Sequence, residues 1–374
     1  GGGVRRTAKS RYDAISAYIS RRAAARLNDV PCETDEAALQ ALRGEGVDEP
    51  LARHLAHLFA RDPLVAFEGF VEEVDDAASM EHFESLNSTN WQTVRWKPPP
   101  PPSACGPRIG WRTEFRSMEV QLTDFENAAF TVFVVLLTRA MLVFDLDLLI
   151  PLSKVDENMS RAHAVDAVGA QRFWFRSDMM PKGVRPVSAS EDAPPPECEE
   201  MTMRNIICGK GMFPGLVPLC YAYLDYIRCD EESFKRVDAY LTLVRRRANG
   251  ELMTAAAWMR RFVREHPEYR RDSVVTQGIA YDLARACDDI GRGRRPCPEL
   301  LGDASVEPLG PDGAYDTQLT GAADRGAAVR KLVDRLWKRA GSSDDSLDST
   351  DTAPSPKRAR CSPSSPCSSS STES

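Results

Sequence analysis

The chain has 374 residues, of which 42% are hydrophobic and 28% charged, enough for one large or two ordinary globular domains with a buried core. Its 55 acidic residues outnumber its 48 Lys and Arg residues, and the formal net charge is −7. This acidic balance argues against a general binder of nucleic acid or of anionic membranes, whose surface should be basic. No apolar run reaches about 18 residues, so we expect no membrane-spanning helix.

The first residues and the cysteines bear on the compartment of the protein. The start, Gly-Gly-Gly-Val-Arg-Arg, has no Met and no apolar stretch, so it does not predict a signal peptide and indicates a fragment of a longer chain. The ten cysteines form no C-x-x-C pattern and no close pairing with histidine, which argues against a structural zinc site. We expect reduced thiols and a cytoplasmic protein.

The N-terminal part of the chain predicts helices. Residues 10–70 show helical periodicity, and the first apolar stripe consists of Tyr12, Ile15 and Ile19. A second helix is expected to begin at Asp48-Glu49-Pro50, because an acidic cap followed by proline favours a first turn. The Asp62-Pro63 pair should end that helix.

The middle of the chain predicts two strands followed by a long helix. Runs at 90–97 and 109–116 are rich in aromatic and β-branched residues, which favours strands. Five consecutive prolines at 98–102 lie between them and predict a polyproline II connection at the surface. From 119 to 144 the pattern becomes a long apolar helix, which we expect to be the buried spine of the domain. Each strand should also have an apolar face that packs on this helix.

The rest of the chain predicts a loop, more helices and a tail. The stretch at 182–200 is rich in proline, serine and acidic residues and predicts an exposed loop. Helices are expected at about 216–228, 232–248, 253–265 and 322–339, the last with one basic face. The serine-rich residues 341–374 cannot bury a core and should be disordered.

These patterns predict a helix-dominated α+β fold with a few antiparallel strands. The expected organisation is a disordered or truncated start at 1–8, one domain over 9–310, a linker with an amphipathic helix at 311–340 and a disordered tail at 341–374.

Side-chain alternation along the two strands predicts a cationic surface. If the strands pair, one face carries four cations around a single carboxylate, and its members are Trp91, Thr93, Arg95, Lys97, Arg112, Glu114 and Arg116. Such a face is either a solvated surface with ordinary ion pairs or a cradle for phosphate oxygens, in which Glu114 holds a bridging divalent cation.

Several stretches resemble the catalytic subunit of the eukaryotic glutamate–cysteine ligase family. The longest are I-G-W-R-T-E-F-R-S-M-E-V-Q-L-T-D-F-E-N-A-A-F (109–130) and S-T-N-W-Q-T-V-R-W-K-P-P-P-P (88–101). Shorter matches, such as G-E-L-M-T (250–254), follow in the same order. The resemblance spans about residues 9–302 and covers the C-terminal half of that family's chain.

This resemblance implies a glutamine-synthetase-like fold, in which an antiparallel sheet forms a funnel lined by magnesium-binding carboxylates. It implies an ATP-dependent ligase of glutathione biosynthesis. ATP phosphorylates the γ-carboxylate of L-glutamate, and the amine of L-cysteine then displaces phosphate from the acyl phosphate. Magnesium is the implied cofactor. Because the family's other metal-binding carboxylates lie in the N-terminal half, the fragment alone is expected to be inactive.

The resemblance also implies roles for individual residues. Glu114 resembles a magnesium ligand, and Arg116 resembles a contact to the transferring phosphate or to substrate. Lys97 resembles a contact to an ATP phosphate, and Trp91 resembles a wall of the cysteine pocket.

Tyr12 and Arg11, in K-S-R-Y-D (9–13), resemble substrate-pocket residues. Ser117 stands where the family usually has proline, a departure that removes no charged group. The implied partners are ATP, L-glutamate and L-cysteine, with a modifier subunit or a second copy of the chain left open. We expect no nucleic-acid or membrane partner.

Two alternatives stay open at this point. One is a catalytically silent regulatory or scaffold chain of the same fold, and the other is a carboxylate–amine ligase that accepts another amine. Retention of Lys97, Glu114 and Arg116 together with Trp91 argues against the silent chain, because a scaffold does not need all four.

A few other features are expected to be structural. His54 and His57 lie three residues apart on a helix, but no further ligand is evident nearby, which favours packing or hydrogen bonding over metal binding. Gly209-Lys210-Gly211 does not satisfy the phosphate-loop pattern and predicts a turn. We expect core positions for Trp96, Trp111 and Trp174.

Overall fold

The computed structural model describes residues 9, 13–61, 75, 77–88, 94–97, 99, 109–116, 118–179, 196–211, 213–309 and 314–318. Over these residues the fold is helix-dominated α+β, as the sequence predicts, and it contains three two-stranded antiparallel sheets. The expected start at 1–8, the helix at 322–339 and the tail at 341–374 lie outside the described residues.

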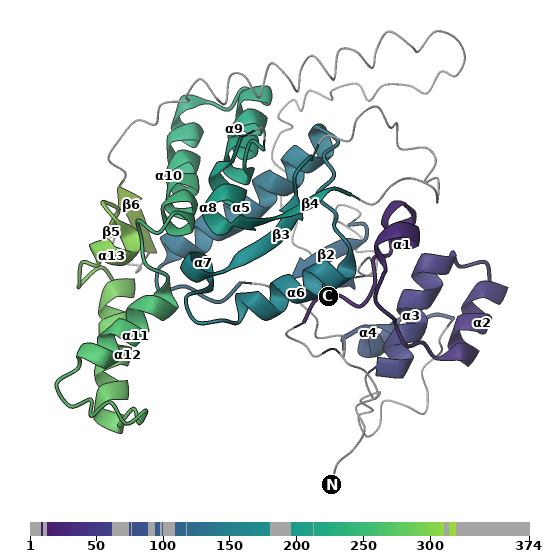
Figure 1. Ribbon diagram of the computed structural model, residues 1–374, viewed down its shortest axis with the longest axis horizontal. Helices are drawn as coiled ribbons and strands as arrows, with labels where there is room; N and C mark the ends of the chain where they lie inside the picture. Colours follow the sequence, from purple (N-terminus) through teal and green to yellow (C-terminus); the bar gives the residue numbers. More distant parts are fainter. Residues whose placement is uncertain are drawn as a thin grey trace, which may run out of the picture.

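Four helices occupy one end of the long axis (Figure 1), namely α1 (Arg21–Leu27), α2 (Glu36–Gly44), α3 (Glu49–Arg61) and α4 (Glu81–Ser88). The Asp35 side chain caps α2 by accepting a hydrogen bond from the amide of Ala38. Buried Leu39 on α2 packs against Ala52 and Ala56 on α3. Helix α3 begins and ends close to the predicted residues.

The helix expected around Tyr12, Ile15 and Ile19 is wrong, because residues 13–20 are not helical. Their backbone is held by tertiary contacts instead. The amide of Tyr18 donates to the Asn28 side chain at 2.8 Å, and the Tyr18 hydroxyl donates to the carbonyl of Ile150 at 2.9 Å. Contacts with distant residues therefore override the local helical periodicity.

The centre of the molecule is built from helices α5 (Asp124–Val143), α8 (Met203–Cys208), α9 (Leu216–Tyr226) and α10 (Glu231–Ala248). Helix α5 packs along both α9 and α10 (Figure 1). Leu136, Leu219 and Leu241 are buried at this interface, in the largest hydrophobic cluster. The predicted positions of α5, α9 and α10 are confirmed to within a few residues.

The expectation that α5 is the buried spine of the domain is wrong. Only 22% of its most apolar 18-residue stretch is buried, and Leu142 is 72% exposed. Within the part of the chain that the structure describes, α5 is also the one helix long and apolar enough to cross a membrane by length and composition, which the sequence analysis does not anticipate. Its contacts with α9 and α10 are those of a helix with one face in a protein core.

A second strand pair covers this core and was not predicted. Strands β3 (Arg172–Arg176) and β4 (Cys198–Thr202) pair antiparallel, and helices α6 (Leu152–Ala162) and α7 (Ala167–Ala170) precede them. Phe173 and Met201 lie directly opposite each other and are buried in the central cluster. The exposed loop predicted over 182–200 is therefore wrong for its last residues, which belong to β4.

The far end of the molecule contains α11 (Ala255–Glu265), α12 (Gln277–Gly291), α13 (Pro298–Leu301) and the pair β5 (Ser305–Leu309) and β6 (Ala314–Gln318). A second hydrophobic cluster joins these helices to α5 and α10. Trp258, Ile290 and Leu300 are buried in it together with Phe125 at the start of α5.

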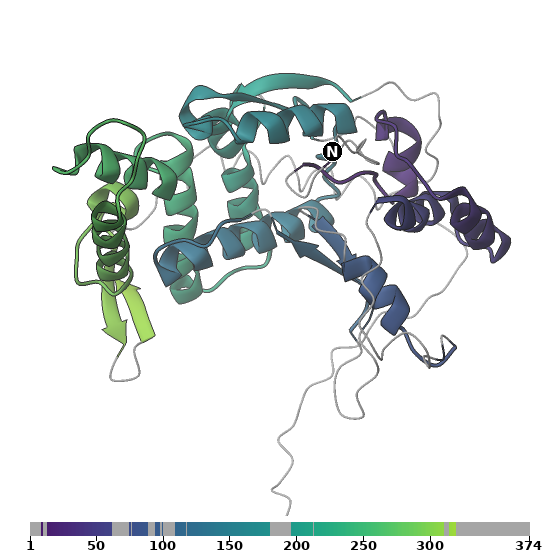
Figure 2. The ribbon, with the colours of Figure 1, turned by 90° about the horizontal axis from the view of Figure 1, so that it is seen from below.

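The remaining strands, β1 (Val94–Lys97) and β2 (Arg112–Phe115), pair antiparallel and are called the site strand pair below. They lie within the two strands predicted at 90–97 and 109–116 and are shorter than predicted at 109–116. The neighbouring helix α4 extends away from the helical core when the molecule is seen from below (Figure 2). Among the described residues, neither large hydrophobic cluster contains a member of β1 or β2.

Candidate functional site

The register of the site strand pair determines which side chains share a face. Arg95 lies opposite Glu114, and Lys97 lies opposite Arg112. Residues directly opposite each other in an antiparallel pair point to the same face, and Arg116 follows Glu114 by alternation. The predicted face, with Arg and Lys residues around one carboxylate, is therefore confirmed.

Glu114 is the centre of this face. Its carboxylate contacts Arg95 Nη2 at 3.1 Å, Lys97 Nζ at 3.3 Å and Arg116 Nε at 2.7 Å. Partial burial acts to raise the pKa of the Glu114 carboxyl, but the hydrogen bonds from Arg116 and Lys97 and the charge of Arg95 outweigh it. The pKa of Glu114 consequently lies below its ordinary value, and the group is ionised at neutral pH.

The face has more positive charge than its carboxylate can balance. Four cations and one carboxylate leave an excess of three positive charges among the described residues of this face. Lys97 and Arg112 are like charges placed directly opposite each other, an arrangement that destabilises a strand pair. An anion with several oxygens, such as a polyphosphate, would relieve this repulsion and could accept bidentate hydrogen bonds from the arginines.

The structure brings together three of the six predicted site residues, namely Lys97, Glu114 and Arg116. The other three, Trp91, Tyr12 and Arg11, lie outside the described residues, so their predicted positions stay predictions.

The opposite face of the site strand pair is apolar and exposed. The rings of Trp96 and Trp111 stack with centroids 3.9 Å apart, while Trp111 is 48% and Phe115 is 54% exposed. The expectations that this face packs on the long helix and that Trp111 is a core residue are wrong. Helix α5 contacts α9 and α10 instead of this apolar face.

Two anchors of the site strand pair were missed by the sequence analysis. The side chain of Asn87, at the end of α4 and 3% exposed, donates to the carbonyl of Trp96 at 2.9 Å. The second anchor is a buried ion pair between Glu126 and Arg247 at the start of α5. Thr123 and Glu126 form the Thr-x-x-Glu capping-box pattern, which could have signalled part of this anchor, whereas the pattern around Asn87 gives no such signal.

The donor set suits a partial magnesium site. In the described part of the chain, no group of three or more His, Cys, Asp or Glu side chains could enclose a metal ion. Mg²⁺ bound with nucleotides usually takes one or two carboxylates and completes its shell with phosphate oxygens and water. Glu114 fits as one such carboxylate, and the remaining ligands would have to come from elsewhere.

The other sequence features have structural roles. His57 is 5% exposed, and its Nδ1 lies 2.5 Å from the carbonyl oxygen of Glu33, which confirms a packing and hydrogen-bonding histidine. Lys210 forms an ion pair with Glu199 beside the turn at 209–211. Trp174 is half-buried under the Lys154 ammonium, which lies 3.3 Å from the ring centroid, so it is not a core residue in the expected sense.

Fold and site together define a helix-dominated α+β protein with a cationic, carboxylate-centred surface on one strand pair. The sequence matches the family described as Glutamate-cysteine ligase over residues 3–290. It is 49% identical to the mouse (Mus musculus) glutamate–cysteine ligase catalytic subunit over 304 residues, which are 79% of this chain and 47% of that protein.

The human (Homo sapiens) catalytic subunit is 48% identical over 306 residues, 80% of this chain and 47% of that protein. The glutamate–cysteine ligase of Saccharomyces cerevisiae is 37% identical over 302 residues, 75% of this chain and 42% of that protein. The chain belongs to the glutamate–cysteine ligase family. It spans about half the length of the curated relatives that it matches.

Proposed function

We propose that this chain forms part of the active site of a glutamate–cysteine ligase, the enzyme of the first step of glutathione synthesis. Membership of the family supports the reaction. The excess positive charge around Glu114 supports the location, because the reaction gathers ATP phosphates and a substrate carboxylate in one place.

In the proposed reaction, a γ-carboxylate oxygen of L-glutamate attacks the terminal phosphorus of ATP. The bond from that phosphorus to ADP breaks, and an acyl phosphate forms. The amine nitrogen of L-cysteine then attacks the acyl carbon, the bond to the phosphate oxygen breaks, and the nitrogen loses a proton. The products are γ-glutamylcysteine, ADP and inorganic phosphate.

The residues of the site strand pair would act on the phosphates. Lys97 would bind a phosphate oxygen of ATP, and Arg116 would contact the transferring phosphoryl group. Glu114 would exchange its contacts with these cations for contact to the metal. Bound Mg²⁺ would neutralise phosphate charge during transfer. Trp91, Tyr12 and Arg11 are proposed as substrate-pocket residues by family resemblance alone.

The wider assignment is also a proposal. We place the chain in the C-terminal half of a glutamine-synthetase-like ligase, with the other metal-binding carboxylates supplied by the N-terminal half. Association with a modifier subunit is proposed from the same resemblance, and a cytoplasmic location is proposed from the pattern of the cysteines. The "catalytic subunit" in the names of the mouse and human relatives supports the idea of a second subunit.

The observation that carries the proposal is the convergence of three cations on Glu114 within 3.3 Å, beside the opposed Lys97 and Arg112. The test is phosphate release by the ligase containing this chain, measured with ATP, L-glutamate and L-cysteine and with each omitted in turn. Release that needs all three supports the proposal. Release with another amine but not with cysteine would favour a different ligase, and no release would favour the silent chain.

A further inference from the structure

The short segment that joins the site strand β2 to helix α5 is held by polar contacts together with apolar packing of Leu122 against the second hydrophobic cluster. This connection comprises the described residues 118–123 and carries Met118, 50% exposed, and Val120, 84% exposed. Apolar side chains that remain in solvent contribute little to fixing a segment. Polar interactions therefore add to the packing of Leu122 in fixing where β2 ends relative to the helical body.

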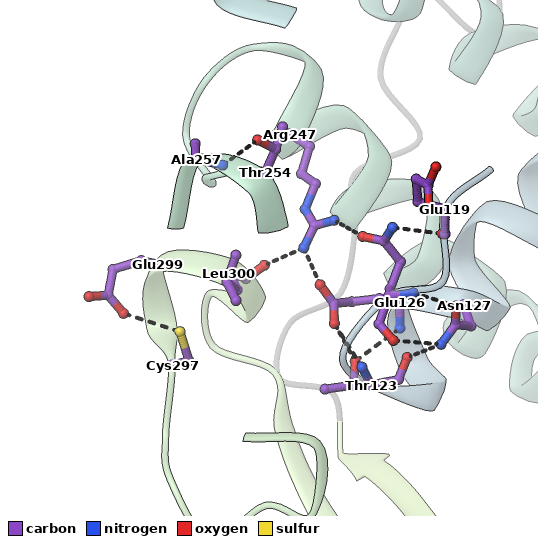
Figure 3. A network of polar contacts seen from close by, with 11 residues as sticks. Glu119, Thr123, Glu126, Asn127, Arg247, Thr254, Ala257, Cys297, Glu299 and Leu300 are labelled. Atoms are coloured by element: carbon purple, nitrogen blue, oxygen red, sulfur yellow. Dashed lines mark hydrogen bonds and ion pairs between the residues drawn. The ribbon is translucent and has the colours of Figure 1, made fainter. Parts of the chain in front are cut away.

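Those interactions begin with Glu126 in the first turn of α5, which is fully buried. One oxygen of its carboxylate accepts hydrogen bonds from the amide of Thr123 at 3.0 Å and from the Thr123 hydroxyl at 2.8 Å. The other oxygen is paired with Arg247 Nη2 (Figure 3). A single carboxylate thus joins the end of the connection to helix α10.

Arg247 extends this link to two more segments. Its Nη1 donates to the Gln121 side chain in the connection at 2.9 Å, and its Nη2 contacts the carbonyl of Leu300 on α13 at 3.4 Å. Gln121 in turn donates to the carbonyl of Glu119 at 2.9 Å. Figure 3 shows the guanidinium between the α5 and α13 contacts. Among the described residues, Arg247 Nε is buried without a hydrogen-bond partner, so the guanidinium is not fully satisfied.

Asn127 completes the network from the next position of α5. Its side chain accepts from the amide of Gln121 at 2.9 Å and donates to the carbonyls of Gln121 and Thr123 at 3.2 and 2.8 Å. Backbone groups of the connection are therefore bonded to the start of α5, and the start of α5 is bonded to α10.

A buried ion pair of this kind is an expensive way to stabilise a fold. Removing two charges from water costs several kcal/mol per ion, and apolar residues of similar volume often stabilise as well or better. The pair does, however, fix direction and distance, because the guanidinium donates only in a fixed plane. The pair lies one short connection away from Glu114 and Arg116, so it can hold these two residues in a fixed position.

We infer that Arg247 and Glu126, acting through Gln121, are positioning residues of the ligase that hold strand β2 where Glu114 and Arg116 meet the ATP phosphates. This inference rests on the proposed function. The residues themselves need not touch substrate. Their effect on the reaction is transmitted through the place of β2, because a displacement of about 1 Å in a catalytic group can cost about 10²-fold in rate.

The test replaces the pair without leaving a buried charge unpaired. In the double variant Glu126→Gln/Arg247→Met, glutamine can still cap Thr123 and methionine fills the space of the arginine, so we expect the melting temperature to stay close to that of the unsubstituted protein. The matched control is Asp147→Asn/Arg176→Met. It removes a largely buried pair, 2.8 Å between charged atoms and with side chains 10% and 14% exposed, that ties β3 to the segment after α5.

Two readouts decide the question. The first is hydrogen exchange of the β2 amides, 112–115, which should become about tenfold faster in the Glu126/Arg247 variant and unchanged in the control. The second is the kinetics of the ligase containing this chain. Its kcat/KM for Mg·ATP should fall about 10²-fold, with kcat carrying most of the loss, because misplaced Arg116 no longer meets the transferring phosphate.

Unchanged β2 exchange and kinetics in the folded variant, or equal changes in the control, would overturn the inference. If the double variant fails to fold, the same two measurements are made on Gln121→Ala. This substitution removes the hydrogen bond between Arg247 and the connection but keeps the Glu126–Arg247 ion pair. If the unsubstituted ligase releases no phosphate, the proposed function fails, while β2 exchange still decides whether the pair positions the strand.

Discussion

At the scale of single residues, the ionisation of Glu114 is controlled by the cations around it. Its three cationic neighbours come from both strands, so pairing of the strands creates the charge cluster. Its lowered pKa means that its ion pairs stabilise the fold above the pKa of the unfolded chain. That contribution is lost as the pH falls through the lower pKa of the folded state. The carboxylate is therefore charged at neutral pH.

We predict that Glu114→Gln lowers ATP- and cysteine-dependent phosphate release at least about 10²-fold, because an uncharged amide is a poor ligand for Mg²⁺. The variant should stay folded, because the ion pairs that it loses are partly exposed and contribute little to stability. Phosphate release and circular dichroism are the measurements. Glu119→Gln, an exposed carboxylate five residues further on, is the control. Equal activity of the two variants would remove Glu114 from the site.

Lys97→Met should mainly weaken ATP binding. The ammonium is a point charge for a phosphate oxygen, so its loss should raise the KM for ATP about tenfold and leave the KM for cysteine nearly unchanged. The matched control is Lys235→Met, which removes an exposed partner of Glu231 on α10. An unaltered KM for ATP would contradict the proposed contact.

At the scale of elements, helix α5 depends on its first turn. Thr123 caps the helix, and its hydroxyl also donates to the buried Glu126 carboxylate. We predict that Thr123→Ala costs about 2–3 kcal/mol, because it removes a cap and leaves Glu126 with one bond fewer. Thr254→Ala removes an ordinary cap from α11 and should cost about 1 kcal/mol. Urea unfolding measures both, and equal losses would show that the bond to Glu126 contributes nothing.

Helix α3 should show a pH response of its own. The His54 ring keeps some accessible surface but is enclosed by protein atoms, and this burial, with a small effect of His57, lowers its pKa from 6.5 to about 4. A depressed histidine pKa favours the neutral form in the folded state, so stability is complete above pH 6.5 and falls as the pH drops toward 4. His54→Gln should flatten this part of a plot of melting temperature against pH. An unchanged slope would show that His54 does not cause it.

Elements with strong local signals were predictable, and elements made by distant contacts were not. The alternation in β1 and β2 was sufficient to assign the face of Glu114, because the register kept the faces that alternation defined. Strands β3 and β4 were missed, since β4 directly follows a Pro- and Ser-rich stretch and is stabilised by burial of Met201. The segment at 13–20 failed for the opposite reason, because Tyr18 bonds to Asn28 and Ile150 instead of to its own turn.

The site showed the same division. Lys97, Glu114 and Arg116 were found because they share one pair of strands. Arg247 could not be found, because it lies 121 positions after Glu126 and meets it only through the packing of α10 on α5. Long-range polar contacts leave no periodic trace in a sequence.

At the scale of the whole molecule, the site strand pair is joined to the neighbouring helix α4 through β1 and to the helical body through the segment after β2. Asn87 holds β1 to α4, and the Glu126–Arg247 pair holds the segment after β2 to α10. A two-stranded sheet is marginal by itself in water, so its place depends on such anchors. The chain also spans about half the length of its curated relatives, and its described residues contain no group of three or more His, Cys, Asp or Glu side chains that could hold a metal ion.

The most direct measurement is a crystal structure of the ligase containing this chain with Mg²⁺ and a non-hydrolysable ATP analogue. The account predicts a magnesium ion about 2.1 Å from a Glu114 carboxylate oxygen. It also predicts phosphate oxygens in place of Glu114 as the partners of Lys97 and Arg116. A nucleotide bound away from the site strand pair, with Glu114 still paired to its three cations, would contradict it.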